Sequence, residues 1–131
     1  MPKLTGFKKV TAFPLNEITV TTNGSIIDTK VSNMYSFNTA LVDINIGNLG
    51  DQDSTKVKIQ ESDSPTFASG VTTAKGGEEI TVSANTQYTM QVERRKRYLR
   101  PVITITSGAG QDPRAVACIG MILWNIPTPF P

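Results

Sequence analysis

The sequence predicts an all-β chain that folds as a single β-sandwich domain, and three observations lead to this expectation. Apolar and polar residues alternate with period two in most segments, as they do in strands with one buried face. Clusters of Gly, Asn, Asp, Ser and Pro interrupt these segments roughly every ten residues, which is typical of sandwiches and barrels. No segment keeps a helical period over three turns, and 131 residues suffice for one domain with a substantial core.

The expected strands follow from this alternation. They cover residues 16–22, 40–46, 55–61, 79–83, 87–93, 98–106 and 115–124. In the second of them Val42 and Ile44 share one face, and in the third Val57 and Ile59 point inward while two lysines point outward. β-branched residues are abundant throughout, as strands prefer. Between the third and fourth strands, residues 65–69 are expected to form one short helical turn or an irregular edge.

The last expected strand differs from the others because both of its faces are apolar. One face carries Val116, Cys118, Ile122 and Trp124, and the other carries Ala117, Ile119, Met121 and Leu123. Such a strand is either central in a sandwich or covered by another subunit.

Extended arms are expected on both sides of the sandwich, which itself should cover residues 15–124. Three prolines within residues 125–131 exclude a central strand and predict an extended tail with apolar anchors at Ile126 and Phe130. Residues 1–14 are expected to form the N-terminal arm, in which Phe7 and Phe13 stand among lysines.

Composition excludes several classes of function. Histidine is absent, which removes the commonest general base and the commonest metal ligand. The single cysteine cannot form an intrachain disulfide, which indicates a protein made in a reducing compartment. The N-terminus has lysines but no apolar run after them, so we expect no signal peptide, and no segment is apolar enough to span a membrane. We therefore expect no cofactor, no metal and no enzymatic activity.

The remaining candidates for catalysis are better explained as structural positions. Cys118 stands in an apolar strand, where thiols are usually inert packing residues. Glu78 and Glu79 are adjacent and therefore on opposite faces of a strand. Glu61 and Asp63 are expected to be solvated positions at a turn. None of these places a nucleophile beside a base.

Cations concentrate in one segment, formed by Arg94, Arg95, Lys96, Arg97 and Arg100. Three interpretations remain open: a solvated loop between two strands, ion pairs with a protein partner, or contacts with phosphates. Nucleic acid is the least favoured, because few aromatics stand nearby and the net charge is only +2. Arginine suits interface ion pairs because its planar fork matches a carboxylate.

Several segments follow one another in a recognisable order: 26–29, 40–51, the "QESD" hairpin within 54–63, the "RYLR" strand start at 97–100 with 102–106, and an Ala- and Ile-rich last strand before a proline-containing tail. Together they resemble small proteins encoded beside the major capsid protein of tailed bacteriophages. This chain departs from that pattern in its denser basic run and its longer "WNIPTPFP" ending.

The resemblance implies a jelly-roll-like sandwich that acts as a cement or decoration protein on the outer surface of the capsid, after synthesis in the bacterial host cytoplasm. Its partner would be the major capsid protein, and the chain would be a homotrimer, with a dimer as the alternative. The residues expected at protein interfaces are Phe7, Lys8, Lys9, Phe13, Arg94, Arg95, Lys96, Arg97, Arg100, Trp124, Ile126 and Phe130.

A carbohydrate- or receptor-binding module on the virion surface is the alternative function, because β-sandwiches often carry sugar sites. Such a site requires an aromatic platform flanked by polar side chains. The only tryptophan, Trp124, ends a hydrophobic strand, and the three tyrosines are scattered along the chain. The sequence therefore favours the structural role over the sugar site.

Overall fold

The computed structural model describes residues 8–30 and 37–125, which form ten β-strands and no helix. In chain order they are β1 (Lys8–Ile18), β2 (Thr22–Asn23), β3 (Ile27–Asp28), β4 (Thr39–Leu49), β5 (Ser54–Ser62), β6 (Thr72–Thr73), β7 (Ile80–Thr81), β8 (Thr86–Glu93), β9 (Tyr98–Thr106) and β10 (Ala115–Trp124). All the pairings between them are antiparallel.

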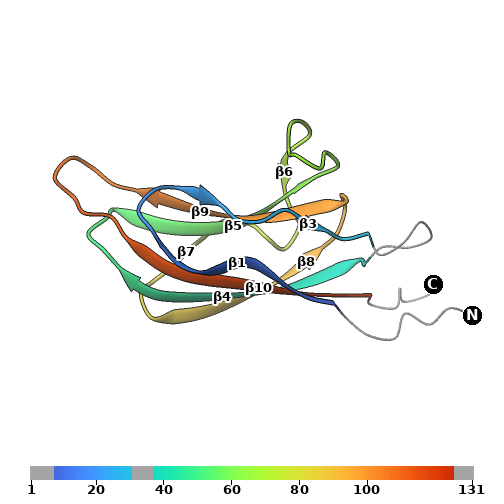
Figure 1. Ribbon diagram of the computed structural model, residues 1–131, viewed down its shortest axis with the longest axis horizontal. Helices are drawn as coiled ribbons and strands as arrows, with labels where there is room; N and C mark the ends of the chain where they lie inside the picture. The colour runs from blue at the N-terminus through green and yellow to red at the C-terminus, as the bar shows by residue number, and fades with distance from the viewer. Residues whose placement is uncertain (1–7, 31–36, 126–131) are drawn as a thin grey trace, which may run out of the picture.

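The strands form two layers that face each other (Figure 1). The first sheet has the order β1-β10-β4-β8, and the second has the order β2-β9-β5-β6, with β3 also paired to β9 and β7 also paired to β5. One set of these pairings is nested, from the ends of the chain to its middle. β1 pairs with β10, β2 and β3 pair with β9, β4 pairs with β8, and β5 pairs with β6 and β7. This is one long antiparallel hairpin rolled into a sandwich, which is the topology of a jelly roll. The expected jelly-roll-like β-sandwich is confirmed.

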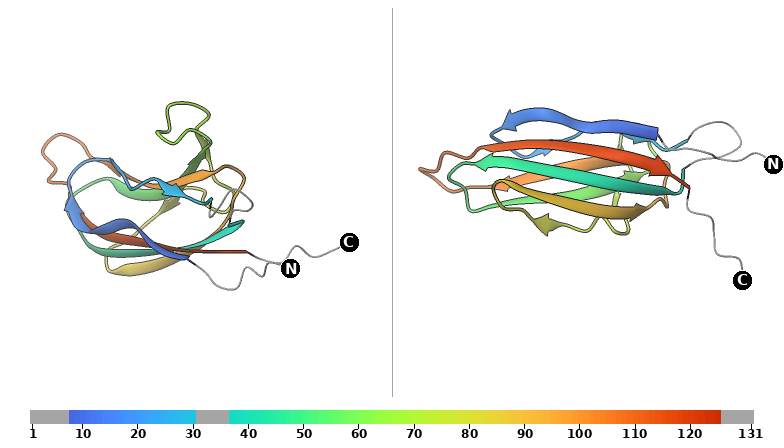
Figure 2. Two further views of the ribbon diagram at one scale, coloured as in Figure 1. Left: turned by 45° about the vertical axis from the view of Figure 1, so that its right-hand side comes forward. Right: turned by 90° about the horizontal axis from the view of Figure 1, so that it is seen from below.

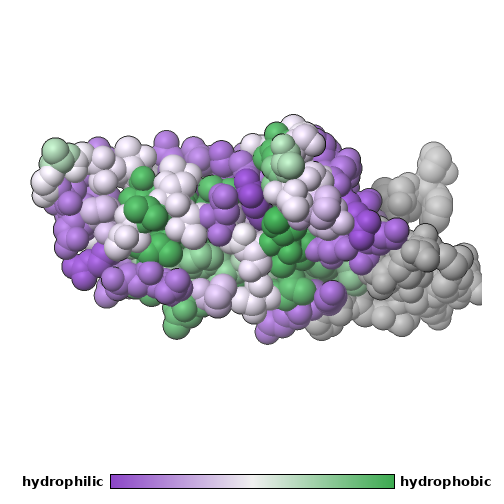
Figure 3. All heavy atoms as spheres, turned by 45° about the horizontal axis from the view of Figure 1, so that its top comes forward, coloured by the Kyte–Doolittle hydropathy of each residue, from purple (hydrophilic) through white to green (hydrophobic). Residues whose placement is uncertain are grey.

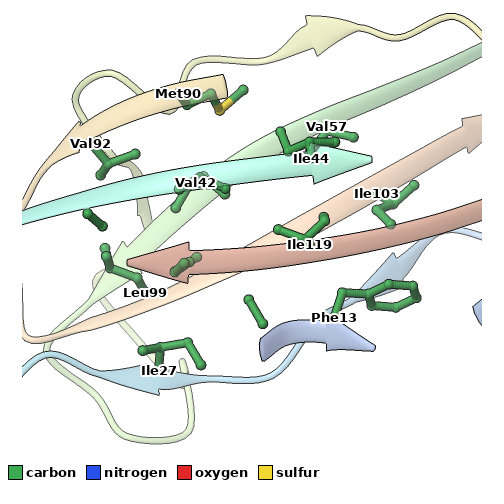
Figure 4. Close-up of a cluster of buried hydrophobic side chains, with 14 of the residues drawn as sticks. Phe13, Ile27, Val42, Ile44, Val57, Met90, Val92, Leu99, Ile103 and Ile119 are labelled. Atoms are coloured by element: carbon green, nitrogen blue, oxygen red, sulfur yellow. The ribbon is translucent and has the colours of Figure 1, made fainter. Parts of the chain in front are cut away.

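Apolar side chains from both sheets point toward one another and fill the space between the layers (Figure 4). Val42 and Ile119 of the first sheet and Val57 and Leu99 of the second are fully buried. Each side chain of this size contributes roughly 1.5–3 kcal/mol by leaving water. The alternation expected for 40–46 and 55–61 is confirmed, because these strands bury every second residue.

The first strand begins earlier than the sequence predicted. β1 starts at Lys8, so residues 8–14 belong to the sandwich and not to an arm. Ala12 and Phe13 lie in the core, and Pro14 fits because β1 is an edge strand. Its register against β10 shifts twice, between Thr11 and Phe13 and between Phe13 and Asn16. These irregularities break the period-two pattern, which is why the part of β1 before residue 16 was not predicted.

Residues 63–71 form a loop between β5 and β6 that rises above the second sheet (Figure 1). It holds a turn at Pro65 and Thr66 where a short helical turn or irregular edge was expected. Phe67 is nearly buried and has a positive φ of 56°, an uncommon conformation for a bulky side chain. The view with this sheet brought forward shows hydrophobic residues only in separate patches among hydrophilic ones (Figure 3).

Candidate interaction surface

The outer face of the first sheet carries a row of apolar side chains. β10 lies between β1 and β4 in this sheet, as Figure 2 (right) shows from below. Its residues alternate strictly between buried positions and half-buried positions on the outer face. The half-buried apolar residues are Val116, Cys118, Ile122 and Trp124, and Leu41 of β4 stands opposite Ile122. We call these five residues the apolar stripe.

Polar residues flank the apolar stripe on both sides. On the β4 side Asp43 and Asn45 share its face, and on β8 Gln87 lies opposite Asn45. The Asp43 carboxylate accepts a hydrogen bond from Gln87 Nε2 at 2.6 Å and another from Asn45 Nδ2 at 3.2 Å. On the β1 side Lys9 lies opposite Ile122 and is exposed. An apolar centre with a polar rim is the usual composition of a protein interface.

A shallow pocket lies at the Val116 end of the stripe. Its lining residues are Glu17, Asn48, Leu49, Gly50, Arg114 and Val116. Arg114 also forms an ion pair with Asp112 at 3.5 Å, and both side chains are largely exposed. The pocket therefore continues the outer face, and the charged side chains of Glu17 and Arg114 join apolar ones in its lining.

The basic segment is bound to other parts of the same chain. Arg95 Nη2 lies 2.9 Å from Glu61 Oε2 and donates to the Thr73 carbonyl oxygen at 2.8 Å. Glu61 is 1% exposed and also accepts a hydrogen bond from Thr72 Oγ1 at 2.8 Å. The expectation that Glu61 is solvated is wrong. It lies an even number of residues after Val57 and Ile59 in β5, so its side chain is on the same face as theirs and points to the interior. Arg95 closes the end of the sandwich over this carboxylate.

A second ion pair joins the same turn to β3. Arg97 donates two parallel hydrogen bonds to Asp28, from Nε at 2.9 Å and from Nη2 at 2.8 Å. These bonds hold the pKa of the Asp28 carboxyl below its usual value and raise the pKa of Arg97. The backbone N–H of Arg97 donates to Asp63 Oδ1 at 3.0 Å. The bidentate geometry fixes β3 against the β8–β9 connection.

The other cations of the segment also have partners within the chain. Arg94 Nε donates to Thr29 Oγ1 at 3.1 Å, and Lys96 Nζ donates to the Gly70 carbonyl oxygen at 2.6 Å. The Arg100 guanidinium lies 4.3 Å from the centre of the Phe67 ring. These five cations thus connect β3, β5, β6 and the 63–71 loop to the β8–β9 connection and the start of β9. Their contact with a partner protein stays a prediction.

The other predicted interface residues are distributed differently. Phe13 is 5% exposed in the core, so the expectation that it anchors an arm at an interface is wrong, because β1 turns its side chain inward. Lys8 and Lys9 are exposed at the start of β1, and Trp124 is half-buried at the end of the stripe. Phe7, Ile126 and Phe130 lie outside the described residues.

The acidic and thiol candidates from the sequence do not assemble into one site. In residues 8–30 and 37–125 no three carboxylates and thiols group as metal ligands would. The pKa of Glu78 is lowered by hydrogen bonds from its own backbone N–H and that of Gly76. Cys118 lies on the outer face rather than in the core. No helix in the described part of the chain could cross a membrane.

Sequence reasoning missed three residues of these sites. Asp43 fell within the expected strand 40–46 and Phe67 within the segment 65–69, and neither was singled out, while Glu61 was expected to be solvated. Of the three, only Glu61 could have been predicted from the sequence, because its even spacing from Val57 and Ile59 places it on the buried face of the strand.

No protein-family model matches the sequence, and none of the curated proteins does. Among solved structures the chain is similar to PirA, with 20% identity, a TM-score of 0.43, and 95% of this chain and 97% of that chain covered. It is similar to FLHE, with 12% identity, a TM-score of 0.43 and coverage of 92% and 96%. It is also similar to the Tobacco streak virus coat protein, with 13% identity, a TM-score of 0.41 and coverage of 100% and 94%.

Proposed function

We propose that the protein is a structural virion subunit, a cement or decoration protein that binds the outside of a bacteriophage capsid and stabilises contacts between major capsid proteins. The observation that carries this proposal is the apolar stripe. β10 already packs one face into the core, and its other face is apolar and only half-buried. Contiguous exposed apolar surface marks interaction sites, and tryptophan, here Trp124, is enriched among interface hot spots.

Two further features support the proposal. The sequence resemblance to capsid-associated proteins of tailed phages implies this role. A cement subunit must also add contacts between capsid proteins without deforming, which requires a stiff body. The Arg95–Glu61 and Arg97–Asp28 pairs fasten one end of the sandwich and supply such stiffness. The trimer, or alternatively the dimer, expected from the sequence stays a prediction, and light scattering on the purified protein would measure it.

The test is to mix purified protein with capsids that lack it and to image them. We expect regular density on the outer surface of the shell and capsids that resist heating better. Ile122→Lys should abolish this binding because it places a charge within the apolar stripe. Val20→Lys is the matched control, because Val20 is 67% exposed in the β1–β2 connection and lies outside the stripe. Absence of density at saturating wild-type protein would refute the proposal.

A further inference from the structure

Gly120 stands at the centre of the apolar stripe, where nothing in residues 8–30 and 37–125 requires a glycine. Its φ lies outside the left-handed region, and an added Cβ would meet only the Val10 carbonyl oxygen, at 3.9 Å. The register of β10 against β4 is regular around it, and the neighbouring irregularity in β1 leaves room for a side chain. A glycine inside a strand costs roughly 0.5–1 kcal/mol relative to alanine. In strands it often marks a place where a ligand or another backbone approaches closely.

The missing side chain leaves a notch in the outer face. Along β10 the notch lies between Cys118 and Ile122 on the same face. Across the sheet, Thr11 of β1 and Asp43 of β4 are paired with Gly120. Directly opposed residues of adjacent strands have side chains about 5 Å apart at Cβ, so Asp43 borders the notch on the β4 side.

Asp43 is oriented but not neutralised. Its two oxygens accept hydrogen bonds from the neutral amides of Gln87 and Asn45, at 2.6 Å and 3.2 Å. No ion pair within 4.0 Å reaches it from the described residues. An ionised carboxylate offers about four acceptor positions, so about two remain for a further donor. A surface that covers the stripe would desolvate this charge, and that is costly unless the surface brings a cation.

We propose that the notch over Gly120 receives one arginine side chain of the capsid protein, whose guanidinium pairs with Asp43 while its aliphatic part lies between Cys118 and Ile122. This inference rests on the proposed function and names the chemistry that the stripe recognises. Arginine fits better than lysine because its planar fork can use both remaining acceptor positions. The two amides hold the carboxylate in place before binding, which lowers the entropy that association costs.

The experiment compares variants in binding to capsids that lack the protein, at several salt concentrations. Asp43→Asn should bind about thirtyfold more weakly or worse, as loss of one partner of a buried pair does. Gly120→Leu should also bind weakly, because it fills the notch while the space above the strand accommodates the side chain. Asp51→Asn and Gly108→Leu are the controls, since both residues are exposed in turns away from the notch. Thermal unfolding shows whether each variant is folded.

A second measurement needs no variant. Cys118 borders the notch, so bound capsid should protect its thiol from alkylation in the wild-type protein. Full alkylation at saturation would overturn the inference, as would equal binding by wild type, Asp43→Asn and Gly120→Leu. In both cases the proposed function survives, because the wild type still binds. If the wild-type protein itself fails to bind capsids, the proposed function fails.

Discussion

Replacing Arg95 by methionine should destabilise the fold by about 3 kcal/mol, because the change leaves the Glu61 carboxylate charged and unpaired inside the sandwich. Glu61 is 1% exposed, and Arg95 is the cation that neutralises it, at 2.9 Å. Removing one partner of a buried pair usually costs about 3–5 kcal/mol. The lower value applies because 47% of the Arg95 side chain is exposed and Thr72 still donates to the carboxylate. For a chain of this length, the loss corresponds to a fall in Tm of roughly 10 °C.

Urea unfolding followed by the fluorescence of Trp124, the only tryptophan, measures this loss. The matched control is Lys75→Met, which breaks the Lys75–Glu93 pair at 3.1 Å, whose side chains are 63% and 59% exposed. Pairs of that kind contribute about 0–1 kcal/mol. If Arg95→Met lowers the free energy of unfolding no more than Lys75→Met does, burial does not strengthen the Arg95–Glu61 pair, and the reasoning is refuted. Adding Glu61→Gln to Arg95→Met should recover part of the loss, because no buried charge remains.

Three further changes test other parts of the structure. The pKa of Asp28 is lowered from its ordinary value of 3.8. Its ion pair with Arg97 therefore stabilises the fold fully at pH values above 3.8, and this stabilisation is lost as the pH falls through the lowered pKa. Acid titration of Asp28→Asn should therefore show a shallower loss of stability below pH 3.8 than the wild type; identical acid limbs would contradict this. Gly76→Ala should cost about 2 kcal/mol or more, because φ is +88° and the new Cβ would lie 2.0 Å from a carbonyl oxygen. Gly108→Ala should change Tm little, because the new Cβ would meet only Gln111 Oε1, at an ordinary contact distance of 4.0 Å. Phe67→Ala should cost about 2–4 kcal/mol and make the 63–71 loop easier to cleave in limited proteolysis, because the ring under Arg100 is buried; unchanged cleavage would argue against this packing.

The sequence predicted those parts of the fold that local alternation determines. The strand around Val42 and Ile44 and the strand around Val57 and Ile59 lie as expected, because the parity of a strand is visible in the sequence. The start of β1 was predicted too late in the chain, because two register shifts around Phe13 interrupt the alternation of buried and exposed residues.

The candidate site was less predictable than the fold. That Asp43 and Gln87 meet depends on the register between β4 and β8, which the residues of either strand alone do not reveal. The notch requires the pairing of Gly120 with Asp43, which also depends on register. The basic segment was visible at once, but its partners Asp28 and Glu61 lie far away in the sequence. Tertiary pairing therefore decided whether those charges face inward or outward.

The pairing of the first strand with the last has a consequence for how the chain folds. β1 can complete its hydrogen bonds only when β10, the last described strand, has left the ribosome. Until then the apolar residues around Phe13 have no partner strand, and one of the two inner positions of the first sheet is vacant. Folds dominated by such distant pairings form slowly, in milliseconds to seconds, and expose strand edges meanwhile.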